Sequence, residues 1–196
     1  MLNLTFDDGP DERWTPRILG ELERCQTRAT FFMVGERVRA RPDVARQVLD
    51  AGHEVQLHCH RHIRHNQLSE REIQRDAELG LAALAGVGAR ATLWRTPWGV
   101  RTDASARAAE RLGLRLLGWS IDTHDWRGDE AQAMLAHARG QLADGGAVLM
   151  HDALGPGARR SGCENTISLL SALAATAREL GLRLAPMGEL AAAVPA

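Results

Sequence analysis

Short strand-like segments alternate with longer amphipathic segments along the chain. The strand-like segments combine apolar runs or apolar alternation with a turn signal at the end, such as Gly35 after Phe31 and Phe32. The longer segments repeat apolar residues at helical spacing. We predict strands over residues 2–7, 29–35, 54–57, 92–95, 114–122, 146–151 and 182–186. We predict helices over residues 14–24, 38–51, 69 to near 85, 103–112, 130–142 and 166–180.

Strands that alternate with helices in this way are typical of a parallel sheet covered by helices. Seven strands favour an incomplete barrel over an open doubly wound sheet. A length of 196 residues suits one domain with a core of ordinary size, and no repeat or linker interrupts it. We therefore predict a single α/β domain over residues 1–196, folded as a distorted, incomplete (β/α) barrel with about seven parallel strands.

Nearly every predicted strand ends in side chains that can carry chemistry. These side chains are Asp7 and Asp8, His58 and His62, Arg95, Asp122 and Asp125, and His151. In barrels of this kind the carboxyl ends of the strands meet at one face, where the loops build the active site. We therefore expect residues far apart in sequence to share one pocket.

A cluster of histidines indicates a metal site. Five of the eight histidines lie within residues 52–65. We predict that the spacing of four places His58 and His62 on one face of a single helical turn, where both imidazoles could bind one ion. Asp8 could supply an anionic third ligand. A solvated histidine-rich turn is the alternative interpretation.

Two nitrogens and one oxygen suit zinc, with cobalt, nickel or manganese as alternatives, and leave positions for water and substrate. A bound divalent ion lowers the pKa of water from about 15.7 toward about 7. Asp7 is placed to be the base that completes the deprotonation. Both neighbouring aspartates can reach the pocket only if the end of the strand twists, which Gly9 and Pro10 would permit.

The remaining strand-end residues suit supporting roles. Arg95 could hold Asp7 by a bidentate pair that keeps it ionised and oriented. His151, as a protonated imidazole, could donate to a leaving amine, and Asp125 could raise its pKa by lying beside it. Each of these residues alone could be merely structural, but their positions at successive strand ends favour a joint function.

The composition excludes several classes of function. A formal net charge of −1 gives no basis for binding nucleic acid or an anionic membrane through bulk charge. All 24 basic residues are arginine, which excludes a lysine Schiff base.

No apolar run approaches the roughly 20 residues of a membrane span. The first residues lack a signal-peptide pattern, so we expect a cytoplasmic protein if the chain is the whole product. Three dispersed cysteines suit reduced thiols.

Five motifs together resemble the polysaccharide deacetylases of the NodB homology type, carbohydrate esterase family four, over nearly the whole chain. The similar segments are Thr5–Pro10, His58–His62, Arg95–Gly99, Asp122–Trp126 and Val148–His151. They follow one another in the family's order. Any one of them would be weak evidence, whereas the five together are highly specific.

The resemblance implies a metal-dependent hydrolysis that removes an N-acetyl group from an amino sugar. It implies that Asp7 is the base, that Asp8, His58 and His62 are the metal ligands, and that His151 is the general acid. It also implies that Arg95 orients the base and that Pro97 and Gly99 line the groove. A backbone N–H near Trp98 would help to hold the oxyanion. Trp98 and Trp126 suit stacking against sugar rings, although either could be a core residue.

Some positions depart from the family pattern. Cys59 replaces the usual Ser or Thr, so a hydroxyl hydrogen bond that braces the metal loop is lost or weakened, and a soft extra ligand is an alternative role. We interpret His60 and His65 as flanking-loop residues. Trp98 stands where the family often has Tyr.

The expected substrate is a soluble oligosaccharide, glycoside or biosynthetic intermediate of the N-acetylglucosamine type. This expectation rests on the predicted location alone. Two other functions stay open: an amidase that acts on a cyclic or non-sugar amide with the same fold, and a non-catalytic carbohydrate-binding scaffold. The oligomeric state cannot be predicted.

Overall fold

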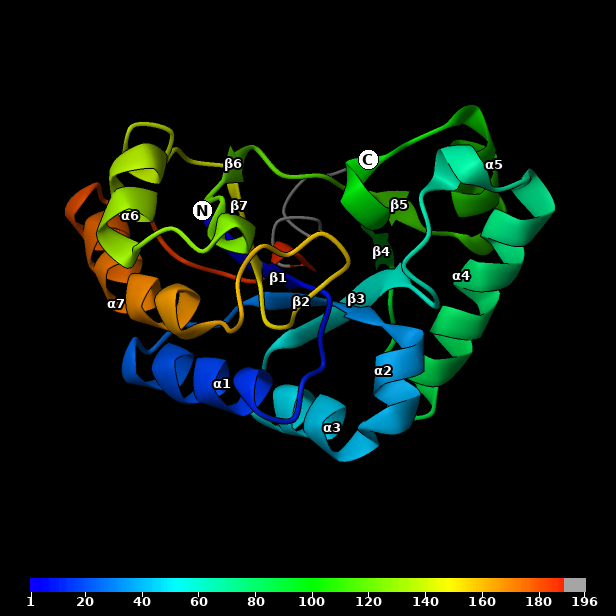
Figure 1. Ribbon diagram of the computed structural model, residues 1–196, viewed down its shortest axis with the longest axis horizontal. Coiled ribbons are helices and arrows are strands. Elements are labelled where there is room, and N and C mark those ends of the chain that lie inside the picture. The colour runs from blue at the N-terminus through cyan, green and yellow to red at the C-terminus, as the bar shows by residue number, and fades with distance from the viewer. Residues whose placement is uncertain (189–196) are drawn as a thin grey trace.

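The computed structural model describes residues 1–188, which form one curled parallel sheet with helices around it (Figure 1). The strands are β1 (Asn3–Asp7), β2 (Thr30–Val34), β3 (Glu54–Cys59), β4 (Leu93–Trp94), β5 (Arg115–Leu116), β6 (Ile121–Asp122) and β7 (Ala147–His151). The helices are α1 (Trp14–Arg24), α2 (Gly35–Ala40), α3 (Pro42–Asp50), α4 (Glu70–Ala85), α5 (Asp103–Leu112), α6 (Ala131–Arg139) and α7 (Glu164–Glu179). Three 3₁₀ turns complete the list: η1 (His65–Gln67), η2 (Pro97–Gly99) and η3 (Asp125–Arg127).

The strand order β5-β4-β3-β2-β1-β7-β6 makes a half-barrel whose two edges are the short strands β5 and β6. Every pairing between these strands is parallel. This architecture confirms the predicted incomplete (β/α) barrel with seven parallel strands. The predicted domain of residues 1–196 extends past the described part, because residues 189–196 lie outside it.

Two predicted strands were wrong. The predicted strand 114–122 is two strands, and the chain between β5 and β6 crosses from one edge of the sheet to the other. An apolar run carries no information about which neighbour it pairs with, so this division could not be seen in the sequence. The predicted strand 182–186 makes only an isolated bridge between Leu184 and Leu2. Pro186, two residues after Leu184, has no N–H with which to continue a ladder.

One predicted helix was also wrong. The segment 38–51 is divided into α2 and α3 at Arg41, because Pro42 cannot supply a backbone N–H to the preceding turn and instead begins the next helix. The helix predicted from Ser69 is confirmed together with its capping box, in which Ser69 and Glu72 bond each other's backbone N–H.

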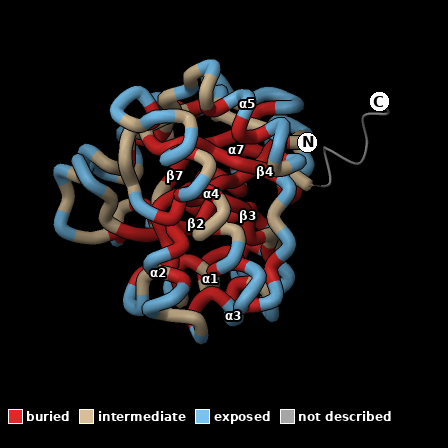
Figure 2. The backbone as a smooth tube through the Cα atoms, turned by 90° about the vertical axis from the view of Figure 1, so that its right-hand side faces the viewer, coloured by how far each residue is buried: buried red, intermediate tan, exposed pale blue. Residues whose placement is uncertain are grey.

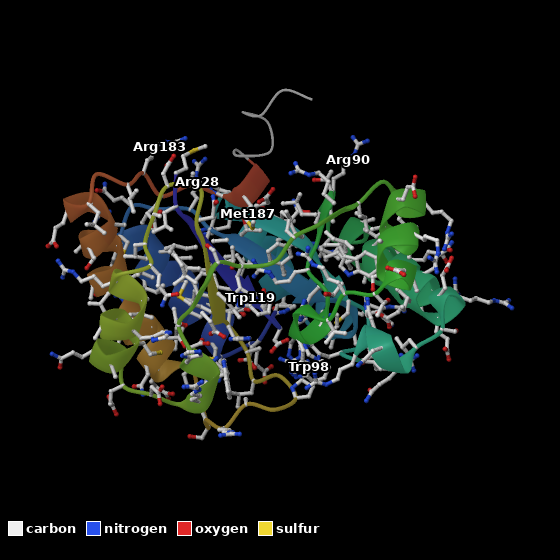
Figure 3. The ribbon with its side chains drawn as sticks, turned by 90° about the horizontal axis from the view of Figure 1, so that it is seen from above. Arg28, Arg90, Trp98, Trp119, Arg183 and Met187 are labelled. Atoms are coloured by element: carbon white, nitrogen blue, oxygen red, sulfur yellow. The ribbon has the colours of Figure 1, made fainter. Side chains whose placement is uncertain are left out.

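The core lies between the strands and the inward faces of the helices, where Figure 2 shows most of the buried residues. Phe6 and Phe31 stack at the centre of the sheet with ring centroids 4.9 Å apart. Among residues 1–188 no helix is long and apolar enough to cross a bilayer. Figure 3 shows Trp98 at one end of the strands and Arg28, Arg90 and Met187 at the other. The end with Trp98 is the carboxyl end of the strands, where the predicted chemistry should gather.

Candidate active site

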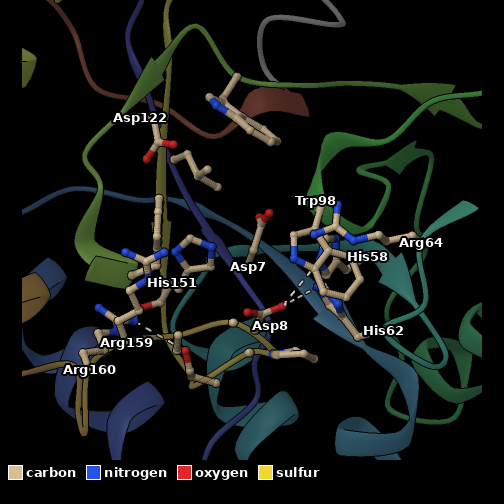
Figure 4. A pocket seen from close by; sticks show the side chains of 18 residues that line it. Asp7, Asp8, His58, His62, Arg64, Trp98, Asp122, His151, Arg159 and Arg160 are labelled. Carbon is tan, nitrogen blue, oxygen red and sulfur yellow. Dashed lines mark hydrogen bonds and ion pairs between the residues drawn. The ribbon is translucent and has the colours of Figure 1, made fainter. Parts of the chain in front are cut away.

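A cavity of about 390 Å³ opens at the carboxyl ends of the strands. Figure 4 shows Asp7 and Asp8 at its centre, with His58 and His62 on one side and His151 on the other. The residues that were predicted for the site and that line this cavity are Asp7, Asp8, His58, His62, Trp98, Asp122, Trp126 and His151. Strands β1, β3 and β7 thus bring together side chains from the two ends of the chain.

Asp8, His58 and His62 form a compact group of possible ligands, with one donor atom from each within 4.8 Å of the others. Asp8 Oδ1 lies 3.5 Å from Nε2 of His58 and 3.1 Å from Nε2 of His62. The Nδ1 atom of His58 lies 2.7 Å from the carbonyl oxygen of Arg95. Because a carbonyl only accepts, Nδ1 carries the proton, and the lone pair of Nε2 is directed at the site.

The predicted helical turn through His58 and His62 is wrong. His58 lies within β3, and the chain bends after Cys59 to bring His62 back beside it, with ring centroids 4.9 Å apart. The buried carboxylate of Asp76 on α4 holds this bend by accepting from the backbone N–H groups of His60, at 2.7 Å, and Arg61, at 2.9 Å. A strand followed by a braced bend therefore produces the same proximity as the helical spacing.

The group fits a divalent cation. Asp8 Oδ1 is buried and has no hydrogen-bond partner, although two imidazoles approach it. Burial lowers the pKa of His58, but Asp7 and Asp8 raise it more, so the net shift is upward. Such a negative field around two imidazole nitrogens favours a positive ion at their centre. Two imidazole nitrogens and one carboxylate oxygen are also the donor types that zinc prefers.

The strand end twists at Asp8 itself, whose φ of 77° lies in the left-handed region. This conformation turns the Asp8 side chain toward the cavity although Asp7, its neighbour, already faces it. The twist expected at the end of the strand is therefore present, and it lies at Asp8, directly before Gly9 and Pro10. Left-handed backbone at a non-glycine residue is costly and is typical of functional sites.

Arg95 holds Asp7 from below the cavity. Its fully buried guanidinium donates from Nη1 to Asp7 Oδ1 at 2.7 Å and to Thr5 Oγ1 at 2.8 Å, and from Nη2 to the carbonyl of Gly118 at 2.9 Å. The predicted bidentate pair is therefore wrong, because Arg95 contacts Asp7 through Oδ1 alone. This single contact orients the carboxylate while leaving Oδ2 available to take a proton.

His151, which is partly exposed to the cavity, forms a dyad with the fully buried Asp125. Asp125 Oδ1 lies 2.7 Å from Nδ1 of His151, and Asp125 Oδ2 accepts a hydrogen bond from the backbone N–H of His151 at 2.9 Å. Burial lowers the pKa of His151, but the charge and hydrogen bond of Asp125, together with Asp8 and Asp7, raise it to about 9. The imidazole is therefore protonated at neutral pH, as a general acid requires.

Arg160 supports this dyad by hydrogen bonds to both residues, a role that was not predicted from the sequence. Its Nη1 donates to Asp125 Oδ2 at 2.9 Å, and its Nη2 donates to the carbonyl of His151 at 3.0 Å. Thr166 also donates to Asp125 Oδ2, at 2.8 Å. No sequence signal separates Arg160 from the other arginines.

Aromatic side chains form two walls of the cavity. Trp98 has a left-handed backbone, with φ of 53°, and packs edge-on against His62 with ring centroids 4.1 Å apart. Trp126 on η3 lines the cavity on the side of His151. Trp119, from the segment that crosses the open side of the barrel, also lines it and was not predicted. Pro97 and Gly99 flank Trp98 in η2 but do not line the cavity, so the prediction that they line the groove is wrong. They hold Trp98 in position instead of contacting a bound substrate.

Comparison with known proteins identifies the family. Residues 1–117 match the family model described as polysaccharide deacetylase. The chain belongs to the polysaccharide deacetylase family. It is 31% identical over 192 residues to a peptidoglycan-N-acetylglucosamine deacetylase of Bacillus cereus, an alignment that covers 97% of this chain and 87% of the relative.

Two further proteins extend the comparison. A chitooligosaccharide deacetylase of a Bradyrhizobium species is 29% identical over 195 residues, which are 95% of this chain and 89% of that relative. The structure of a family 4 carbohydrate esterase from Streptomyces lividans, in complex with acetate, superposes with a TM-score of 0.84 at 29% identity. That superposition covers 92% of this chain and 89% of the esterase.

The departures from the family motifs have structural explanations. Cys59 ends β3 with its side chain fully buried and is not in the ligand group, so it is no extra ligand in this arrangement. His60 is buried with Nδ1 unpartnered, and His65 packs against Trp94 and bonds Ser105. Neither His60 nor His65 lines the cavity of this polysaccharide deacetylase family member.

Proposed function

We propose that the protein is a metal-dependent hydrolase that removes an N-acetyl group from an amino sugar. The observation that carries the proposal is that one cavity holds a carboxylate, Asp7, and a protonated imidazole, His151, beside the group formed by Asp8, His58 and His62. Hydrolysis of an amide needs a proton acceptor for the attacking water and a proton donor for the leaving nitrogen.

Asp8, His58 and His62 would hold the divalent ion, for which we propose zinc, with cobalt, nickel or manganese as alternatives. When bound, such an ion polarises a carbonyl group and makes water easier to deprotonate near neutral pH. Asp7 would then take the proton of the attacking water on its oxygen Oδ2, since Arg95 holds Oδ1. The backbone N–H near Trp98 would donate to the negative charge that develops on the carbonyl oxygen of the amide.

His151 would finish the reaction by protonating the amine that leaves. Because its Nδ1–H donates to Asp125, the proton that can reach the substrate is on Nε2. Arg160 and Thr166 fix Asp125 in turn and so prevent the dyad from rotating away. Trp98 and Trp126, on two sides of the cavity, would stack against the sugar.

The relatives support an amino sugar as substrate. One is a peptidoglycan-N-acetylglucosamine deacetylase and another a chitooligosaccharide deacetylase. Both names describe N-acetylated amino sugars. We propose a substrate of the same class, an oligosaccharide, glycoside or biosynthetic intermediate.

The test is acetate release from N-acetylglucosamine oligomers and from small N-acetyl glycosides by metal-stripped protein, with and without added zinc. We expect zinc-dependent release that Asp7→Asn reduces by about 10²–10⁴-fold, the usual contribution of a general base. Asp50→Asn, at an exposed position at the end of α3, is the matched control and should retain full activity. Tight zinc binding without acetate release from any sugar would instead favour a non-sugar amide.

A further inference from the structure

Two arginines with no ionic partner line the cavity. Arg64 and Arg159 have no ion pair, and no hydrogen bond from their guanidinium groups, with any residue in the described range 1–188. Arg160, the neighbour of Arg159, differs from it, because its side chain is only 5% exposed and its guanidinium donates to Asp125, Thr166 and two carbonyl groups. Arg160 therefore has a structural role, whereas the N–H groups of the Arg159 guanidinium are free to bind a ligand.

The carboxylates of the cavity lie against groups other than these two arginines. Asp7 is held by Arg95, Asp8 lies between His58 and His62, and Asp122 accepts the backbone N–H of His124 at 2.8 Å. None of them is paired with Arg64 or Arg159. The cavity therefore contains two guanidinium groups whose charge and hydrogen bonds are not satisfied by the protein.

The two arginines are held in place by aromatic rings at different sides of the cavity. The guanidinium carbon of Arg64 lies 4.2 Å from the centroid of Trp98, and that of Arg159 lies 5.7 Å from the centroid of Trp126. Figure 4 shows Arg64 on the side of His58 and His62, and Arg159 on the side of His151. A guanidinium stacked on an aromatic ring keeps its N–H edge free and loses less conformational entropy when it binds a ligand.

We infer that Arg64 and Arg159 bind an anionic group, a carboxylate or a phosphate, on the amino-sugar substrate. This inference rests on the proposed function and narrows its substrate class from N-acetylated amino sugars in general to those that carry an anionic group. A planar guanidinium matches the two oxygens of either anion in a bidentate, charge-assisted hydrogen bond. A sugar placed between the two tryptophans would carry such a group toward one of the two arginines.

The test compares kcat/KM for acetate release within two matched pairs of substrates, with zinc present. One pair is the N-acetylglucosamine tetramer and a tetramer of the same sugars in which alternate residues carry a carboxylate. The other pair is methyl N-acetylglucosaminide and N-acetylglucosamine 1-phosphate. We expect the anionic member of at least one pair to be preferred by about tenfold at low salt, with the preference falling as salt rises. The pair that shows it identifies the carboxylate or the phosphate.

The double variant Arg64→Gln/Arg159→Gln should bring that ratio to about one. A ratio within one enzyme cancels any loss that affects both substrates equally. Arg90→Gln is the charge-matched control, because Arg90 is exposed, has no ionic partner among the described residues, and lies at the opposite end of the strands from Trp98 (Figure 3). It should keep the wild-type ratio.

Three results would overturn the inference. The wild-type enzyme could show no preference in either pair, the preference could persist in the double variant, or Arg90→Gln could abolish it as well. In each case acetate release from the neutral substrates would leave the proposed function intact. Absence of release from all four substrates would reject the proposed function, and the inference with it.

Discussion

Asp7 and His151 are register partners on the adjacent parallel strands β1 and β7. Residues paired in this way point to the same face of a sheet, so both side chains face the cavity. The proposed proton acceptor and proton donor are thus held at a spacing set by backbone hydrogen bonds rather than by loops. A site on paired strands is more rigid than one built on loops alone.

The assignment of the metal ligands predicts that His62→Ala and His60→Ala differ. His62 Nε2 faces Asp8, whereas His60 lies outside the ligand group although it is only two residues away. We expect His62→Ala to weaken zinc binding by at least about 100-fold, because a three-residue site loses one ligand. His60→Ala should retain zinc. Calorimetric titration of metal-stripped protein measures both affinities, and equal losses would show that the ligand assignment is wrong.

The dyad of Asp125 and His151 predicts a shift in the pH profile. The pKa of His151 is about 9, so the protonated acid is present at neutral pH and is lost as the pH rises through about 9. Asp125→Asn removes the charge that raises this pKa and moves it toward the ordinary histidine value of about 6.5. The alkaline limb of kcat/KM should then shift to lower pH, with activity at pH 8 reduced roughly tenfold or more.

A matched control separates this effect from disturbance of the packing. Thr166→Val removes one hydrogen bond to Asp125 but leaves its charge. We expect its alkaline limb to remain near that of the wild type. If the limb of Asp125→Asn also stays in place, then His151 is not the group that limits activity at high pH.

The buried pair of Arg95 and Asp7 predicts a large effect on stability. Both side chains are nearly inaccessible to solvent, with Arg95 at 0% and Asp7 at 5%. Arg95→Met leaves a buried carboxylate without its partner, which costs about 3–5 kcal/mol in the free energy of unfolding. Adding Asp7→Asn should recover part of this loss, because no unpaired charge then remains. Urea unfolding of metal-stripped variants measures the cycle, and strictly additive losses would contradict direct coupling.

The three cysteines should be unreactive in the folded protein. Cys25, Cys59 and Cys163 are all buried and free, and burial raises the pKa of each thiol, that of Cys163 to about 12. A thiolate is the reactive species, so both access and ionisation are suppressed. A thiol-specific reagent should label none of them before unfolding and all three in denaturant. Rapid labelling of Cys59 in native protein would show that the metal loop opens.

The sequence by itself determined the alternation of strands and helices, the capping box at Ser69, and the chemistry at the strand ends. These features depend on local periodicity and on residue type, which are visible without tertiary contacts. The convergence of Asp7, Asp8, His58, His62 and His151 could also be expected, because parallel strands place their carboxyl ends together. The five ordered motifs resemble those of the polysaccharide deacetylase family, to which the chain belongs.

Only the tertiary structure decided how distant segments meet. The division of residues 114–122 between two sheet edges, the single contact of Arg95 with Asp7, and the bend that brings His62 back to His58 depend on packing across the fold. The same holds for the contrast between Arg159 and Arg160. Among 24 arginines, local sequence cannot tell which guanidinium will meet a buried carboxylate and which will face an open cavity, because that choice is made by contacts between residues far apart in the chain.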